Sequence, residues 1–239
     1  MLDALRARVS RLSPAPRALL VALLVSTLAT AASWLLGERI VGTAVGGIFL
    51  AATWLLVLRR RDADARAWGL ALGGMLEVPP SRWGRTALEA LEAVGWALVL
   101  AALIFPPFIV GFVRYWHVQS LAFVLPPKPI DSLLGQVVVV ALPEEAFFRG
   151  YLQTALDHAW PRRIRILGAE VGVGLLISSA LFAIGHLATV PNPARLAVFF
   201  PSLVFGWLRA RTGGIGAGVV FHASCNVLSE GLARGAGIY

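Results

Sequence analysis

The chain has 239 residues, of which 58% are hydrophobic and only 14% are charged, whereas soluble domains carry about a quarter charged residues. Its formal net charge of +8 would suit a nucleic-acid partner, but the basic residues are scattered between long uncharged runs. These features exclude a water-soluble enzyme, a disordered chain and a nucleic-acid-binding module. They predict an all-α, polytopic membrane protein that folds as a helical bundle.

Seven apolar runs predict the transmembrane helices, within a range of six to eight. In chain order they cover residues 18–37, 40–58 and 93–113, a fourth run from about residue 132, a fifth within residues 171–194, and residues 196–208 and 215–229. A span needs about 20 residues, and roughly 17 are tolerable, so the sixth run is short and a re-entrant segment is the alternative there. The first run is too long for the apolar core of a signal peptide, and a second run follows almost at once. It is therefore predicted to be a span.

We expect one integral domain with two parts, an N-terminal two-span hairpin plus a basic inner loop at residues 1–92 and a catalytic membrane bundle at residues 93–239. Basic residues are about three times more frequent on one side of the seven spans than on the other, which predicts that this side is cytoplasmic. That side holds Arg6, Arg8, Arg11, Arg17, Arg59, Arg60, Arg61, Arg66, Arg82, Arg85, Arg162, Arg163, Arg165, Arg209 and Arg211. The N-terminus is then cytoplasmic and the C-terminus lies outside. The arginine-rich composition indicates a bacterial chain, and hence the inner (plasma) membrane.

Few polar side chains with chemical potential lie inside the predicted spans. A charge within a bilayer costs several kcal/mol, so each ionisable residue there is a functional candidate. The candidates are Glu144, Glu145 and Arg149 on the fourth span, His186 on the fifth, and His222 with the amide Asn226 on the seventh.

Glu145 and Arg149 are four residues apart, in the order that favours an ion pair on one helix face. Glu144 is rotated by about 100° from that face, so it must face water, meet a histidine from another span, or take up a proton. Pro143 cannot donate a backbone hydrogen bond to Val139, so the helix can bend beside the carboxylates. The alternative interpretation is a purely structural network that locks the spans together.

The two histidines and Asn226 suit the attack of water on a carbonyl group. A carboxylate and an imidazole orient and deprotonate the water, and the other imidazole and the amide donate hydrogen bonds to the developing oxyanion. The sequence has neither the His-Glu-x-x-His motif of zinc proteases nor a Gly-x-Ser-Gly nucleophile motif. Its aspartates all lie outside the apolar runs, which excludes an intramembrane aspartyl pair.

Three motifs in order, Glu144-Glu145-x-x-x-Arg149, Phe182-x-x-x-His186 and His222-x-x-x-Asn226, resemble those of the CPBP family of intramembrane proteases. That family includes the type II CAAX prenyl endopeptidases and bacterial bacteriocin-processing and self-immunity proteins. The resemblance covers about residues 130 to 230, and the arginine-rich composition also fits the bacterial myxosortase-type subgroup. It implies a glutamate-dependent endopeptidase without a required metal or other cofactor.

The resemblance also implies a role for each motif residue and a class of partner. Glu144 and His186 would activate the water, His222 and Asn226 would form the oxyanion hole, and Glu145, Arg149 and Phe182 would support the site. The substrate would be a membrane-anchored protein or peptide within the lipid bilayer. The alternatives are a catalytically idle binding or immunity protein of the same fold, a proton- or metal-coupled transporter, and a zinc protease that uses Glu144, His186 and His222 as ligands.

Counting residues along the predicted spans gives an expected depth for the site. Glu144 lies roughly 18 Å from the outer end of its span and His222 roughly 10 Å from the inner end of its own. His186 disagrees with them, at about 22 Å from the inner end. Two of the three motifs thus predict a catalytic water in the inner half of the membrane and a cleft that opens to the cytoplasm.

Overall fold

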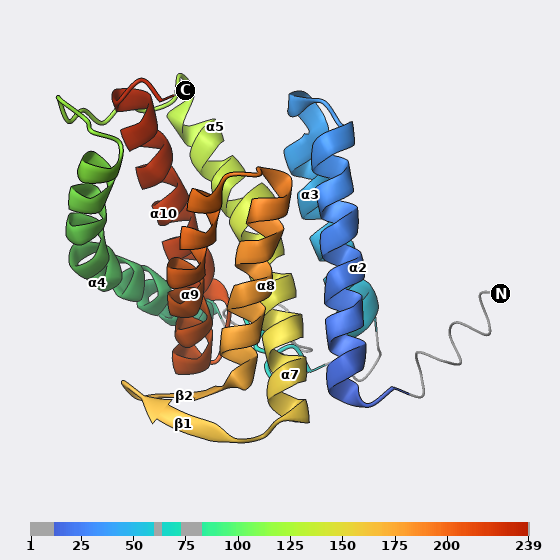
Figure 1. Cartoon of the computed structure of the whole chain (residues 1–239). Coiled ribbons are helices and arrows are strands. Elements are labelled where there is room, and N and C mark those ends of the chain that lie inside the picture. The colour runs from blue at the N-terminus through green and yellow to red at the C-terminus, as the bar shows by residue number, and fades with distance from the viewer. Residues whose placement is uncertain (1–11, 60–63, 73–82, 239) are drawn as a thin grey trace.

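The computed structural model describes residues 12–59, 64–72 and 83–238. Some basic residues of the predicted cytoplasmic side lie outside the described residues, namely Arg6, Arg8, Arg11, Arg60, Arg61 and Arg82. In the described part the chain is almost entirely helical, and its long helices run alternately up and down beside one another (Figure 1). The prediction of an all-α membrane bundle is confirmed.

The N-terminal hairpin has the form that the first two apolar runs predict. It consists of α2 (Pro14–Leu35) and α3 (Glu38–Thr53), which continues directly into the π-helical turn η1 (Trp54–Leu58). By length and composition, α2, the α3–η1 helix and α4 (Trp83–Tyr115) are the described helices that suffice to cross a membrane. The total of seven spans stays a prediction.

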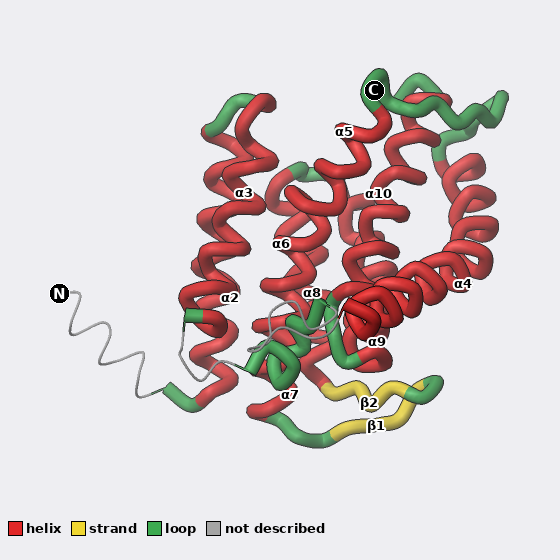
Figure 2. Tube along the Cα trace, turned by 180° about the vertical axis from the view of Figure 1, so that it is seen from behind, coloured by secondary structure: helices red, strands yellow, loops and turns green. Residues whose placement is uncertain are grey.

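The helix α4 joins the third apolar run and the residues before it in one element of 33 residues, so the predicted boundary between residues 92 and 93 falls inside a helix. Pro106 and Pro107 lie in its interior. A proline there removes a backbone hydrogen bond and clashes with the preceding turn, and α4 is bent (Figures 1 and 2). It packs mainly on α10 (Gly216–Gly235).

The fourth predicted span is the helix that carries the glutamate pair, and it is called the central helix below. It is a continuous helical run made of α5 (Pro129–Leu134), η2 (Gly135–Ala141), α6 (Leu142–Glu145), η3 (Ala146–Gln153) and α7 (Thr154–Ala159). Both η2 and η3 are π-helical, a wider winding that is frequent at functional sites. The run contacts α2, α3, α8, α9 and α10, so its polar residues face other helices on several sides.

The fifth predicted span lies within residues 171–194 as expected, and a β-hairpin that was not predicted precedes it. Residues 163–172 form an antiparallel hairpin of β1 (Arg163–Ile166) and β2 (Ala169–Gly172), and α8 (Val173–Thr189) follows it. The turn residues Leu167 and Gly168 both have positive φ, which glycine adopts without strain. The alternation of arginine and isoleucine along β1 is typical of a strand, and the sequence analysis did not use it.

The last two helices lie close to their predicted positions but extend beyond them. The sixth run is the 3-10 helix η4 (Pro193–Val198) followed by α9 (Phe199–Thr212), and the seventh is α10. Gly213, with φ of 76°, terminates α9 in the left-handed conformation that helix C-termini favour. Because α9 packs along α8, the two helices form one layer beside the central helix (Figure 1).

The helix α2 packs on the rest of the bundle through a stripe of small side chains. The buried residues are Ala15, Ala18, Ala22, Val25 and Ala29. Small residues let the backbones of membrane helices approach closely. On the other face of α2, Leu23, Leu24 and Leu28 are all more than half exposed, which suits contact with lipid tails.

Candidate active site

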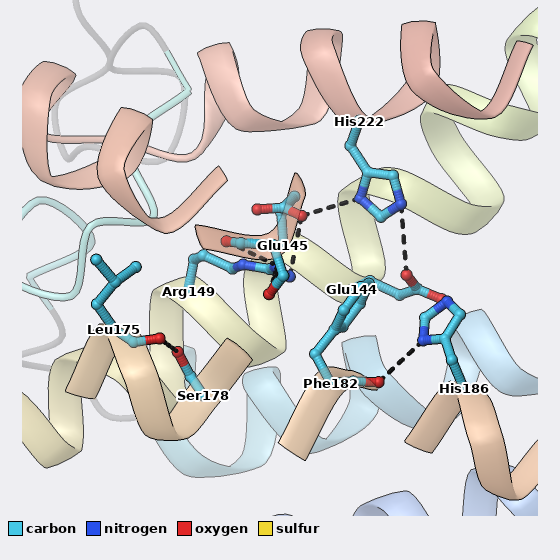
Figure 3. A network of polar contacts seen from close by, with 9 residues as sticks. Glu144, Glu145, Arg149, Leu175, Ser178, Phe182, His186 and His222 are labelled. Carbon is cyan, nitrogen blue, oxygen red and sulfur yellow. Dashed lines mark hydrogen bonds and ion pairs between the residues drawn. The ribbon is translucent and has the colours of Figure 1, made fainter. Parts of the chain in front are cut away.

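The glutamate pair on α6 meets α10 at the centre of the bundle (Figure 3). Glu145 Oε1 lies 2.9 Å from His222 Nδ1 and 3.1 Å from Arg149 Nη1. The side chains of Glu145 and Arg149 are 0% and 1% exposed. The ion pair that the spacing predicts is therefore present, and it is fully buried.

The guanidinium of Arg149 is enclosed by further partners from α8 and α9. Its Nη2 donates a hydrogen bond of 2.7 Å to Ser202 Oγ, and it lies 4.4 Å from the ring centre of Phe182 and 5.2 Å from that of Phe205. A buried ion pair is stable only when such additional contacts compensate for lost hydration. Phe182 thus supports the arginine, and Ser202 is a member of the site that the sequence analysis missed.

His222 lies between the two carboxylates. Because Glu145 is paired with Arg149, we take it as ionised, so it accepts the hydrogen bond and His222 Nδ1 carries the proton. On the other edge of the ring, Nε2 lies 3.7 Å from Glu144 Oε2, beyond hydrogen-bond distance. The ring stacks on Phe205 with a centroid distance of 4.6 Å, which fixes its plane.

Glu144 is the less enclosed of the two glutamates. Its side chain is 13% exposed, and its Oε2 accepts no hydrogen bond from the described part of the chain. In Figure 3 the Glu144 carboxylate lies between the rings of His222 and His186. The sequence left three options for this carboxylate, namely water, a histidine from another span, or a proton. The structure places it near two histidines from other helices.

His186 has one ring nitrogen in a hydrogen bond within α8 and one without a hydrogen-bond partner among the described residues. Its Nδ1 lies 3.0 Å from the carbonyl oxygen of Phe182, and since a carbonyl only accepts, Nδ1 is the donor. In the neutral ring Nε2 is then an acceptor, as a general base or a water-binding group requires.

Glu144 and His186 line one cavity of about 240 Å³ between the N-terminal hairpin, the central helix and α8. Its wall consists of Ser26, Ala29, Thr30 and Ser33 from α2, Val41, Gly42, Val45, Gly46 and Phe49 from α3, Val139, Val140, Glu144 and Phe148 from the central helix, and Phe182, Gly185, His186 and Thr189 from α8. Among the described residues, Glu144 and His186 are the only ionisable side chains in this wall. The contribution of α2 and α3 to the cavity was not predicted, because neither helix carries a motif.

The cavity lies at the opposite end of the bundle from the one predicted. Its α2 residues come from the second half of that helix, its α3 residues from the first half, and Thr189 is the last residue of α8. The prediction was wrong because the fourth helix extends to Ala159, which puts Glu144 at its middle. The residue count for His186, which disagreed with those for Glu144 and His222, indicated this end of the bundle.

Thiol labelling tests this placement. In a Cys225→Ser background, the Ser33→Cys variant carries its thiol in the cavity wall, and the Ala67→Cys variant carries it at an exposed position of the 64–72 segment. If the N-terminus is cytoplasmic, an impermeant thiol reagent is expected to label the Ser33→Cys variant faster from outside. It should label the Ala67→Cys variant faster from inside. Labelling of both variants from the same face would contradict the placement.

Asn226 has its hydrogen-bond partner outside the group of predicted site residues. Its Nδ2 donates a hydrogen bond of 2.9 Å to Gln136 Oε1 on η2, and it is absent from the cavity wall. Gln136 was not predicted, although an amide inside an apolar run was a visible signal. Within residues 12–59, 64–72 and 83–238, no three His, Cys, Asp or Glu side chains form a group that could hold a metal ion.

Comparison with known proteins agrees with the motifs. Residues 126–228 match the family model described as type II CAAX prenyl endopeptidase Rce1-like, and every motif residue lies inside this region. No curated protein and no solved structure matched the chain, and the myxosortase-type subgroup stays a prediction. Residues 126–228 are thus similar to the type II CAAX prenyl endopeptidases of the Rce1-like kind, which are proteases.

Proposed function

We propose that the chain is an intramembrane endopeptidase that hydrolyses a peptide bond of a membrane-anchored protein or peptide with a water activated by Glu144 and His186. The family match supports peptidase activity. The observation that carries the mechanism is that a weakly partnered carboxylate and an imidazole with a free acceptor nitrogen line the same cavity. These are the groups that general-base activation of water requires.

In the proposed reaction, the water lies between the Glu144 carboxylate and His186 Nε2. Glu144 takes a proton as the water oxygen bonds to the carbonyl carbon, and the carbonyl oxygen becomes an oxyanion. The carbon–nitrogen bond then breaks, and Glu144 returns the proton to the leaving amine. One product has a new carboxyl group and the other a new amine, and the enzyme is unchanged.

The remaining motif residues would stabilise charge. A proton on His222 Nε2 would make the ring an imidazolium that faces Glu144, held from behind by Glu145. From there it would donate to the oxyanion, a contribution that strengthens in the transition state. Asn226 donates to Gln136 in the structure, so its role as a second oxyanion donor requires its amide to turn toward the substrate.

The roles of Asn226 and Gln136 can be separated kinetically. Asn226→Ala is expected to lower kcat by about 10²–10³-fold with little change in KM, because loss of an oxyanion donor affects the transition state. Gln136→Ala removes only the partner of the amide and should lower kcat less. Steady-state cleavage of an anchored reporter measures both. If Asn226→Ala mainly raises KM, Asn226 is a docking group.

Comparing membrane proteins from cells that express the wild-type chain or the Glu144→Gln variant tests the proposed function. A protease creates new protein termini that are present only with the wild-type chain, and mass spectrometry maps them. Identical termini in both samples would favour the idle binding protein. Transport of protons or metal ions by the purified protein in vesicles would favour the transporter, and stoichiometric zinc that a chelator removes together with activity would favour the zinc protease.

A further inference from the structure

The cavity beside Glu144 and His186 has walls of mostly small side chains on the side of the N-terminal hairpin. α2 contributes serine, alanine and threonine, and α3 contributes two glycines beside two valines and one phenylalanine. Among the described residues, the only ionisable groups in the wall are the two that the proposed reaction uses. A charged substrate side chain would lose its hydration there, and it would either be repelled by Glu144 or neutralise it.

Gly185 differs from the other glycines in the cavity wall. A Cβ atom built on Gly42 or Gly46 would meet Val139, so these two serve the close packing of α3 on the central helix. A Cβ atom on Gly185 would meet nothing within 4 Å. Gly185 directly precedes His186 on α8 and lines the same cavity. The missing side chain therefore leaves space open beside the proposed water-activating imidazole.

We infer that Gly185 is a specificity-determining residue, which sets the size of the substrate side chain admitted next to the scissile bond. This inference rests on the proposed function. The cavity of about 240 Å³ is smaller than the roughly 300–1,000 Å³ of sites that enclose drug-sized ligands. It has room for one or two uncharged side chains of an extended peptide, and a long lipid group on the substrate would have to lie outside it.

A substitution series at Gly185 tests this inference. The probe is an anchored reporter that the wild-type chain cleaves, made in versions with Ala, Val, Leu or Phe next to the scissile bond. Gly185→Ala, Gly185→Val and Gly185→Leu should reduce kcat/KM progressively. For Gly185→Leu, the fold-reduction in kcat/KM with the Leu and Phe reporters should be at least ten times the fold-reduction with the Ala reporter. One or a few methylene groups in a pocket discriminate between substrates to this degree.

Gly47→Leu is the matched control. Gly47 is also a helical glycine whose added Cβ would meet nothing within 4 Å, but it is absent from the cavity wall. This variant should keep the wild-type order of the four reporters, and thermal unfolding shows whether each variant folds. Equal losses on all reporters, or no change in their order with Gly185→Leu, would overturn the inference. Failure of the wild-type chain to cleave any reporter would instead contradict the proposed function.

Discussion

Replacing Glu144 by glutamine is expected to lower the turnover number by about 10²–10⁴-fold, the contribution of a positioned general base. Glutamine has nearly the same shape but cannot take a proton from the water. The fold should persist, because Glu144 Oε2 accepts no hydrogen bond from the described residues and lies 3.7 Å from His222 Nε2. Reporter cleavage under single-turnover conditions measures the effect on chemistry.

Glu170→Gln is the control for the loss of a carboxylate. Glu170 is exposed on β2, away from the cavity wall, so this variant should cleave at the wild-type rate. Both variants should unfold at nearly the same temperature as the wild-type chain. Wild-type cleavage by Glu144→Gln would show that another group activates the water.

Replacing Arg149 by alanine is expected to destabilise the protein by about 3–5 kcal/mol, the cost of leaving one charge of a buried pair without its partner. The variant also loses the hydrogen bond to Ser202 and the packing against Phe182. Thermal stability and activity should therefore fall together. Glu145→Gln combined with Arg149→Gln removes both charges and should recover part of the stability, which a double-mutant cycle measures.

The pair of Glu230 and Arg234 on α10 is the matched control. It has the same spacing of four residues and an ion-pair distance of 2.8 Å, but its side chains are 21% and 37% exposed. Exposed pairs contribute about 0.2–1 kcal/mol, so Arg234→Ala should change stability by no more than this. An equal effect of the two arginine substitutions, or no coupling in the cycle, would show that burial does not strengthen the Glu145–Arg149 pair.

The sequence was sufficient for those features that depend on local helix geometry. The spacing of Glu145 and Arg149 predicted their ion pair, and the order of the apolar runs predicted the bundle. The position of His222 between two carboxylates depends on how α10 packs against α6, and no local pattern encodes this. The same holds for Ser202, which reaches Arg149 from α9.

The depth of the site was mispredicted for a similar reason. Counting residues from the edge of an apolar run assumes that the helix begins there, but the central helix begins at Pro129 and extends to Ala159. The partner of Asn226 depends on the register of α10 against η2, and the cavity depends on two helices that carry no motif. Both result from tertiary packing.

The cavity wall formed by α2 and α3 has a consequence for how activity is distributed along the chain. The region that matches the family, residues 126–228, contains every motif residue but neither of these helices. Expressed by itself, that region would carry the reactive groups without the compartment that confines a substrate. Two chains with identical motifs are therefore expected to differ in selectivity when their N-terminal hairpins differ. Exchanging the hairpin between them is expected to transfer substrate preference while leaving the catalytic chemistry in place.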